Sequence, residues 1–334
     1  MAFRRLADYI ERIQLSDENT PKPSNRPFNN GTAKNPPLLR PRGVNRILLF
    51  PGSFNPPHQG HLKLLKHVFE NAGEDLHIIG AIILPTDDEM LKNKMAQRDN
   101  AILLTREQRV NLWRGDGIPV DWAWVYDKPE ASWADFRAKL INELSKDQTE
   151  LKFTLLCGPD AITADGGYNP EYWDCPDSII SDVSRSVAFR YPNTLRQLAG
   201  CSPWERLSYD QGRLERQIRA KLKGKQASVI EEELAKAFNK LSTISICRRL
   251  RKPKGTIRFL PCNLDQRPAD APSSTKIREI IASSPSDALE KKLEGMAMHP
   301  KLLVEYIKTL PKPVKAVEAA KEETEKEKWD RIIW

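Results

Sequence analysis

A short apolar run followed by a turn rich in glycine and proline is the feature that most constrains the fold of this chain. Residues 47–50 read Ile-Leu-Leu-Phe, and an uninterrupted run of this kind is typical of a strand buried on both faces of a sheet. Residues 51–60 form the turn, and the apolar side chains that follow recur at helical spacing until Gly73, a residue that often ends a helix. A strand, a turn and a helix in this order predict an α/β fold.

The same alternation continues along the chain. A pattern of Thr105 and Gln108 at capping-box spacing predicts the start of a helix that runs to residue 113. Further strands are expected over residues 76–84, 120–125, 152–157, 187–191 and 256–260, and further helices over 132–144 and 301–310. Alternating strands and helices predict a Rossmann-like, doubly wound parallel sheet.

Composition divides the chain into parts. Residues 1–43 are expected to form an N-terminal helix and a linker arm, residues 44–310 the main domain, and residues 311–334 a charged tail. Within the domain, residues 195–255 are expected to form a helical basic insertion. Between residues 185 and 258 there are 18 basic and 6 acidic residues, whereas the formal net charge of the whole chain is +8. We favour a solvated insertion, with a nucleic-acid contact as the weaker alternative, because no base-reading motif accompanies the charge.

Cysteine spacing and the N-terminal pattern bear on the compartment. The five cysteines are scattered and include no C-x-x-C pair, which argues against a disulfide framework or a zinc ribbon and favours the cytoplasm or the nucleus. Asp8 and Glu11 interrupt the arginine-rich start, which makes a mitochondrial presequence the less favoured reading. No long uncharged apolar run is present, so no membrane segment is predicted. A homo-oligomer is left open.

The chemistry is concentrated in residues 52–61, Gly-Ser-Phe-Asn-Pro-Pro-His-Gln-Gly-His. In a doubly wound fold this turn lies at the carboxyl end of the first strand, where ligands bind. Gly52 and Gly60 allow the backbone to approach a bulky anion, and the helix that begins near Gly60 offers free amides to a phosphate. His58 and His61 are three residues apart, so both imidazoles can face the same phosphate chain.

This stretch resembles the nucleotidyltransferase signature (G/T)-x-F-x-P-x-H-x-G-H. About 215 residues later, Ser273-Ser274-Thr275-Lys276-Ile277-Arg278 resembles the second signature of that superfamily, a turn into a helix. Within the superfamily the chain is most similar to eukaryotic nicotinamide mononucleotide adenylyltransferases. That likeness rests on three stretches, residues 155–160, 169–180 and 298–307. In the second stretch, residues 169–173 resemble the family's tryptophan motif and residues 177–180 are compared with the short helix that follows it.

The resemblance implies transfer of AMP from ATP to nicotinamide or nicotinate mononucleotide, with release of pyrophosphate. It implies that His58, His61 and Arg278 act on the phosphates in the transition state. The residues implied to bind ATP are Gly52, Ser53, Phe54, Gly60, Gly158, Asp160, Ser274 and Thr275. Mg²⁺ would bridge the phosphates and keep most of its waters, so no metal-binding residues are predicted in the chain itself.

The acceptor side is less well defined by the sequence. The resemblance implies that Trp173 and Trp124 hold the nicotinamide ring, with Trp122 as a rival to Trp124, and that Lys92 or Lys94 takes the acceptor phosphate. Residues 86–90, Thr-Asp-Asp-Glu-Met, depart from the Asn-Asp and Tyr of the family. Two alternatives therefore stay open: adenylyl or cytidylyl transfer to another phosphorylated acceptor, or a non-catalytic relative that binds nucleotides or nucleic acid.

Overall fold

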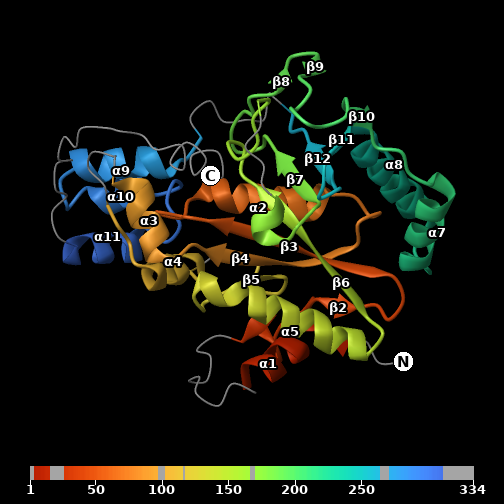
Figure 1. Cartoon of the computed structure of the whole chain (residues 1–334), viewed down its shortest axis with the longest axis horizontal. Coiled ribbons are helices and arrows are strands. Elements are labelled where there is room, and N and C mark those ends of the chain that lie inside the picture. The colour runs from red at the N-terminus through yellow and green to blue at the C-terminus, as the bar shows by residue number, and fades with distance from the viewer. Residues whose placement is uncertain are drawn as a thin grey trace.

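The computed structural model describes residues 4–15, 26–96, 102–115, 117–165, 170–263 and 271–310. At its centre is an eight-stranded sheet (Figure 1). In chain order its strands are β3 (Val44–Gly52), β4 (Ile78–Pro85), β5 (Ala123–Val125), β6 (Glu150–Cys157), β7 (Ser178–Ser181), β10 (Glu205–Arg206), β11 (Ser245–Arg248) and β12 (Thr256–Leu260). Across the sheet they lie in the order β10-β11-β12-β7-β6-β3-β4-β5.

Six neighbouring strands of the sheet pair in parallel, in the spatial order β12-β7-β6-β3-β4-β5. Numbered along the chain, these six follow the 3-2-1-4-5-6 order of the doubly wound fold. The predicted fold class is confirmed. The basic insertion adds β10 and β11, which pair antiparallel at the edge next to β12 and which the sequence reading did not anticipate.

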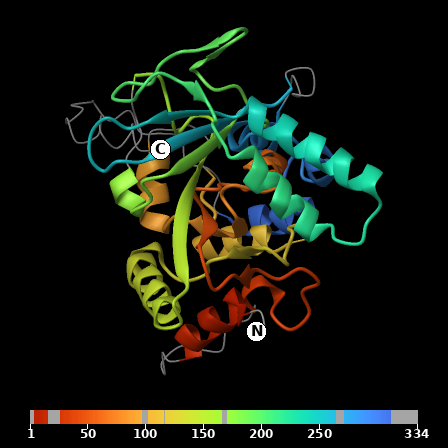
Figure 2. The same cartoon turned by 90° about the vertical axis from the view of Figure 1, so that its right-hand side faces the viewer.

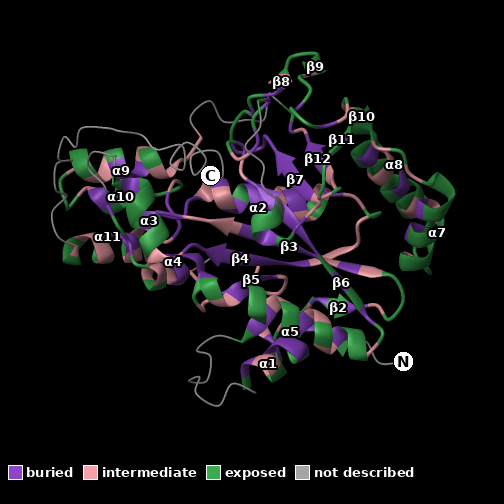
Figure 3. Cartoon of the chain, viewed as in Figure 1, coloured by how far each residue is buried: buried purple, intermediate pink, exposed green. Residues whose placement is uncertain are grey.

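Helices cover both faces of the sheet (Figures 1 and 2). On one face, α1 (Leu6–Leu15) and α5 (Trp133–Lys146) enclose one apolar core; on the other, α2 (Gln59–Asn71), α7 (Gln211–Lys221) and α8 (Ala227–Thr243) enclose a second. The insertion is therefore helical, as expected, and its helices share the main core. Figure 3 shows its outer surface exposed.

A third apolar cluster lies beyond the carboxyl ends of the strands. It joins α4 (Arg106–Trp113), α9 (Ser274–Ser283), α10 (Leu289–Leu293) and α11 (Pro300–Thr309). The capping box predicted at Thr105 is confirmed, since the side chains and backbone amides of Thr105 and Gln108 bond reciprocally. The remaining elements are α3 (Asp88–Met95), α6 (Pro170–Trp173), β1 (Arg4–Arg5), β2 (Leu38–Leu39), β8 (Arg190–Tyr191), β9 (Thr194–Leu195), η1 (Pro27–Asn29) and η2 (Glu130–Ser132).

Three local predictions were wrong. The short helix expected over residues 177–180 is instead β7, because parallel pairing with both β6 and β12 overrides local preference. The strand expected over residues 187–191 reduces to β8, which pairs only with β9, outside the central sheet. The strand expected over residues 120–125 begins at Ala123, because residues 119–122 form a turn in which Trp122 N–H donates to Pro119 O at 3.0 Å.

The ends of the chain are described in part. The predicted N-terminal helix is α1, and residues 26–43 of the arm contain η1 and β2. Residues 16–25 of the arm, residue 169 of the tryptophan motif and the tail over 311–334 lie outside the described residues. Within the described ranges, no helix combines the length and the apolar character that crossing a membrane requires.

Candidate active site

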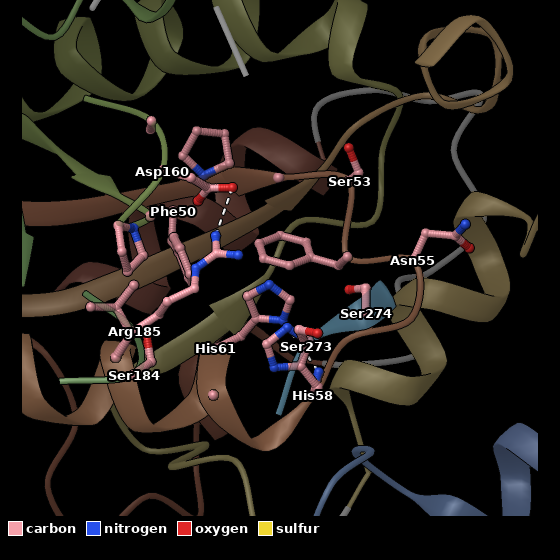
Figure 4. Close-up of a pocket in the computed structure, with 18 of the residues that line it drawn as sticks. Phe50, Ser53, Asn55, His58, His61, Asp160, Ser184, Arg185, Ser273 and Ser274 are labelled. Atoms are coloured by element: carbon pink, nitrogen blue, oxygen red, sulfur yellow. Dashed lines mark hydrogen bonds and ion pairs between the residues drawn. The ribbon is translucent and has the colours of Figure 1, made fainter. Parts of the chain in front are cut away.

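A pocket of about 340 Å³ opens at the carboxyl ends of β3 and β6. These two strands are neighbours in the sheet, and the chain winds away from them in opposite directions, so the pocket occupies the topological switch point at which doubly wound folds bind ligands. Its walls come from the turn after β3, the loops after β6 and β7, and the start of α9. Figure 4 shows these segments converging on the two motif histidines.

The turn after β3 depends on glycine at two close approaches. A Cβ at Gly52 would lie 2.8 Å from the ring of Phe54, whose backbone has a φ of 46°. A Cβ at Gly60 would lie 3.0 Å from the carbonyl oxygen of Pro272. Gly60 is therefore the residue that lets the first motif pack directly against the segment leading into the second.

The two motif histidines lie together at the start of α2. Their rings stack with centroids 3.6 Å apart, and the backbone N–H of His58 donates to Nδ1 of His61 at 3.2 Å. That bond assigns the proton of neutral His61 to Nε2. Burial lowers the pKa of His61 well below its usual value. Burial, with a smaller effect of Arg185, lowers the pKa of His58 to about 3. At neutral pH both rings are uncharged.

The second motif joins the first through two hydrogen bonds at the start of α9, and two further bonds order the second motif itself. Ser273 caps the helix by accepting from Lys276 N–H at 3.1 Å, and Ser274 Oγ donates to Pro56 O at 2.9 Å. Arg278 is buried, and its guanidinium donates to Asn55 O at 2.7 Å and to Thr275 Oγ1 at 3.1 Å. Two segments more than 200 residues apart in the sequence thus form one wall of the pocket.

Asn55, which the sequence reading did not select, holds this wall in place. Its side-chain amide donates to Ile102 O at 2.6 Å and accepts from Leu104 N–H at 3.1 Å. The side chain is 2% exposed. An asparagine inside a Gly/Pro-bounded turn is a common turn residue, so no signal in the sequence marked it as an anchor.

The loops after β6 and β7 supply the opposite wall. Gly158 and Asp160 follow β6 and line the pocket. Asp160 forms an ion pair with Arg185 at 2.8 Å (Figure 4). Arg185 and its neighbour Ser184 also line the pocket, and both were missed. The sequence signal that could have revealed them is the short apolar run that ends at Ser181. If that run is taken as a strand, Arg185 follows its carboxyl end, where doubly wound folds bind ligands.

Two of the predicted acceptor residues lie at the pocket. Trp173 lines it and is 7% exposed. Lys94, on α3, also lines it and donates from Nζ to Ser53 Oγ at 3.2 Å. Lys92 lies on the same helix but is exposed and does not line the pocket.

Trp124 and its rival Trp122 do not lie at the pocket, contrary to expectation. Trp124 is buried in the core on the α5 side of the sheet, where its ring centroid lies 6.0 Å from that of Phe136. Trp122 stacks on Phe69 with ring centroids 3.7 Å apart. Both side chains pack against apolar neighbours, one on each face of the sheet beside the short strand β5.

The charge of the lining suits a polyphosphate. Among the described residues that line the pocket, Lys94, Arg185 and Arg278 are basic and Asp160 is the single carboxylate. In the described part of the chain, no group of three or more His, Cys, Asp or Glu side chains could hold a metal ion. Arrangements of cations with helix N-termini bind phosphates by charge and backbone donors.

Comparisons with known proteins give one family match. Residues 49–172 match the cytidylyltransferase-like family, a span that includes the first motif and the end of β6. No curated protein sequence matches the chain significantly.

Among solved structures, the chain is similar to a Plasmodium falciparum nicotinic acid mononucleotide adenylyltransferase complexed with NaAD. The identity is 14%, the alignment covers 79% of this chain and 95% of that one, and the TM-score is 0.37. For the same enzyme complexed with APC, the identity is 13%, the alignment covers 79% of this chain and 94% of that one, and the TM-score is 0.36. The family match over residues 49–172, on a doubly wound sheet, confirms the resemblance of this chain to the nucleotidyltransferase superfamily.

Proposed function

We propose that this protein is a nicotinamide-nucleotide adenylyltransferase, which transfers AMP from ATP to nicotinamide or nicotinate mononucleotide and releases pyrophosphate. The observation that carries the proposal is the junction of the two signature motifs at one pocket. Ser274 bonds to Pro56 at 2.9 Å and Arg278 to Asn55 at 2.7 Å, so the histidines and the arginine face the same space.

In the proposed reaction, a phosphate oxygen of the mononucleotide attacks the α-phosphorus of ATP in line, and the bond to the β-phosphate bridging oxygen breaks. No covalent bond to the protein is needed, because positioning and charge neutralisation carry such transfers. His61, neutral with its proton on Nε2, donates a hydrogen bond to a phosphate oxygen. Arg278 and the N-terminus of α9 neutralise the charge that develops on the leaving pyrophosphate.

Mg²⁺ would enter as the complex with ATP. The pocket lining supports this mode of binding, since Asp160 is the only carboxylate among the described lining residues and is engaged by Arg185 at 2.8 Å. Phosphate oxygens and water would therefore supply most of the ligands, which is the usual coordination of Mg²⁺ at nucleotide sites. The ion would add positive charge at the transferring phosphoryl group.

On the acceptor side, Trp173 lines the pocket with its ring and Lys94 supplies an ammonium group, hydrogen-bonded to Ser53, for the acceptor phosphate. With Trp124 in the core, one ring, not two, is available from the predicted pair. Other acceptors with a phosphate and a flat or apolar group would fit the same elements, so the acceptor is the part of the proposal that most needs a direct test.

The test is an assay of dinucleotide formation from ATP and Mg²⁺ with nicotinamide mononucleotide, run in parallel with nicotinate mononucleotide and with CTP in place of ATP. We expect turnover within the ordinary enzyme range of roughly 1–1,000 per second with one of the mononucleotides, and none with CTP. Product from CTP alone, or from neither mononucleotide, would contradict the proposed acceptor and redirect the search to other phosphorylated acceptors.

A further inference from the structure

A group of arginines that form no ion pair with any described residue lies at the end of the sheet opposite the pocket. Arg40 and Arg46 flank the start of β3, where Arg40 donates to Val44 O and Arg46 to Leu76 O, each at 2.9 Å. The backbone N–H of Arg46 donates to His77 O at 3.2 Å, which brings His77 to the same place. Because β3 spans nine residues, this end lies about 25 Å from the pocket.

Helix α7 of the insertion extends this group. It lies beside the start of β3 in both views (Figures 1 and 2). Arg213 and Arg216 lie three residues apart on α7, so they share one face, and both are exposed. The charge of Arg213 contributes, after burial, to a lowered pKa of Arg40, so the two guanidinium groups are close in space.

Three nearby carboxylates are engaged elsewhere, whereas Glu74, two residues before Leu76, is exposed. Asp75 pairs with Arg258 at 2.6 Å, and Glu215 with Arg219 at 2.8 Å. Asp210 caps α7 by accepting the backbone N–H of Arg213 at 2.8 Å. Within the described residues, none of the four arginines at this end of the sheet, Arg40, Arg46, Arg213 and Arg216, forms an ion pair.

Such an arrangement is costly for the free protein. Like charges repel, and Arg40 Nε and His77 Nε2 are buried atoms without a hydrogen-bond partner. Burial, with Arg40 and Arg46, lowers the pKa of His77 to about 4. Folded proteins usually break the rules of charge pairing and hydrogen bonding at functional sites, where a ligand supplies the missing partner. Arg213 and Arg216 are the exposed members of this group, so an anion in solution can reach and pair with them.

We propose that Arg40, Arg46, Arg213 and Arg216 form a surface that binds the phosphate backbone of a nucleic acid. An extended polyanion fits better than a single phosphate, because α7 has eleven residues, about 16 Å of length, and exposed lysines lie at its end, at 221, and in the turn that follows, at 223 and 225. A nucleic acid fits better than a lipid surface, because residues 40–46 and 211–225 include no exposed large apolar side chain that could enter a membrane.

The binding should be independent of base sequence. No exposed aromatic side chain lies among residues 40–46 and 211–225 to stack on bases. Backbone contacts alone position a nucleic acid without reading it, and each neutralised phosphate makes binding more sensitive to salt.

The experiment measures binding of the full chain to a fluorescently labelled RNA duplex, and to a DNA duplex of equal length, as salt is raised. We expect binding at low salt, with a slope of log affinity against log salt near about −4 if each arginine neutralises one phosphate. The variant R213Q/R216Q should lose about tenfold or more in affinity at low salt and flatten the slope by about 2.

The matched control is K139Q/K146Q, which removes the same charge from α5 on the other face of the sheet, where both lysines are ion-paired. It should bind as the unmodified protein does. Equal binding by R213Q/R216Q and the control would overturn the proposal, as would binding to vesicles rich in anionic lipid without binding to either duplex. R213Q/R216Q should also keep the catalytic turnover of the unmodified protein, because both residues are exposed and distant from the pocket.

Discussion

His58 and His61 can stack at 3.6 Å because neither ring is charged at neutral pH. Two imidazolium ions at that distance would repel each other, and burial would make the repulsion worse. The lowered pKa values of both residues mean that their contribution to phosphate binding is hydrogen bonding, and that net positive charge comes from Lys94, Arg185 and Arg278. Residues of the same motif thus differ in chemical role.

Removing the His61 ring tests this role. We expect His61→Ala to lower kcat by about 10²- to 10³-fold, the usual loss when one donor to a transition-state oxygen is removed, while the Kd for ATP changes little. The measurement is steady-state turnover beside nucleotide binding by calorimetry. His67→Ala, in the same helix but not at the pocket, should keep near-normal kcat. Turnover of His61→Ala close to that of the control would remove His61 from the mechanism.

The two tryptophans offer a second test at this scale, since one lines the pocket and the other is core. Trp173→Ala should raise KM for the mononucleotide with a smaller change in KM for ATP. Trp124→Ala should leave both KM values near normal but lower the free energy of unfolding by about 3–5 kcal/mol, because a large buried ring is lost. Kinetics and denaturant unfolding of both variants decide the matter. A raised mononucleotide KM in Trp124→Ala alone would reverse the assignment.

At the scale of elements, Arg109 of α4 ties together the segments that carry the two halves of the site. It is fully buried and donates to Ser53 O, Thr86 O and Asp88 Oδ1, each at 2.8 Å. These acceptors lie after β3, after β4 and at the start of α3. Arg109→Ala would leave the carbonyl oxygens of Ser53 and Thr86 without this donor, at a cost of roughly 1–3 kcal/mol for each buried group, whereas water can solvate the partly exposed Asp88 carboxylate.

Arg109→Lys separates positioning from stability. A lysine keeps the charge but cannot reproduce the planar fork, so we expect partial recovery of unfolding free energy and a kcat/KM that stays below that of the unmodified protein. Denaturant titration and kinetics on the same preparations measure both quantities. Full kinetic recovery in the lysine variant would show that Arg109 supplies charge alone.

The sequence predicted elements well where local signals and tertiary contacts agree. The buried run at 47–50, the capping box at Thr105 and the strand β12 were placed within a few residues, because apolar runs and caps act locally. β7 was missed because its four residues become a strand only between β6 and β12. Because β7 was not expected as a strand, Arg185 in the loop after it was not predicted to line the pocket. The turn at 119–122 was not expected either, and Trp124, which follows it, was wrongly placed at the pocket. Motif residues were predictable; their partners, set by packing, were not.

For the whole molecule, the sheet separates two charged regions. The pocket lies at the carboxyl ends of the strands and the arginine surface at the amino end of β3, so the insertion can extend the core through α7 and α8 and add a binding surface without altering the site. This arrangement predicts that the two activities are independent. The same burial that keeps His58 and His61 uncharged also sets how the stability of the whole fold depends on pH.

Stability should fall as the solution is acidified through the range of free histidine. Burial lowers the pKa of His58 to about 3 and that of His77 to about 4, and lowers those of His61 and His67 as well. In the unfolded chain these groups titrate near about 6.5. Below that pH the unfolded state binds more protons than the folded state, so the free energy of unfolding decreases with falling pH.

Nearly buried His58 alone accounts for up to about 1.4 kcal/mol per pH unit in this range. Denaturant unfolding at several pH values between about 7 and 5 measures how the free energy of unfolding changes with pH. Asp147 protonates below this range, because the hydrogen bond from Tyr9 lowers its pKa. His58→Gln should show a shallower dependence than the unmodified protein. A free energy of unfolding that stays constant or rises on acidification through this range would mean that the histidines are charged in the folded protein, and would undermine the role given to His61 as a neutral donor.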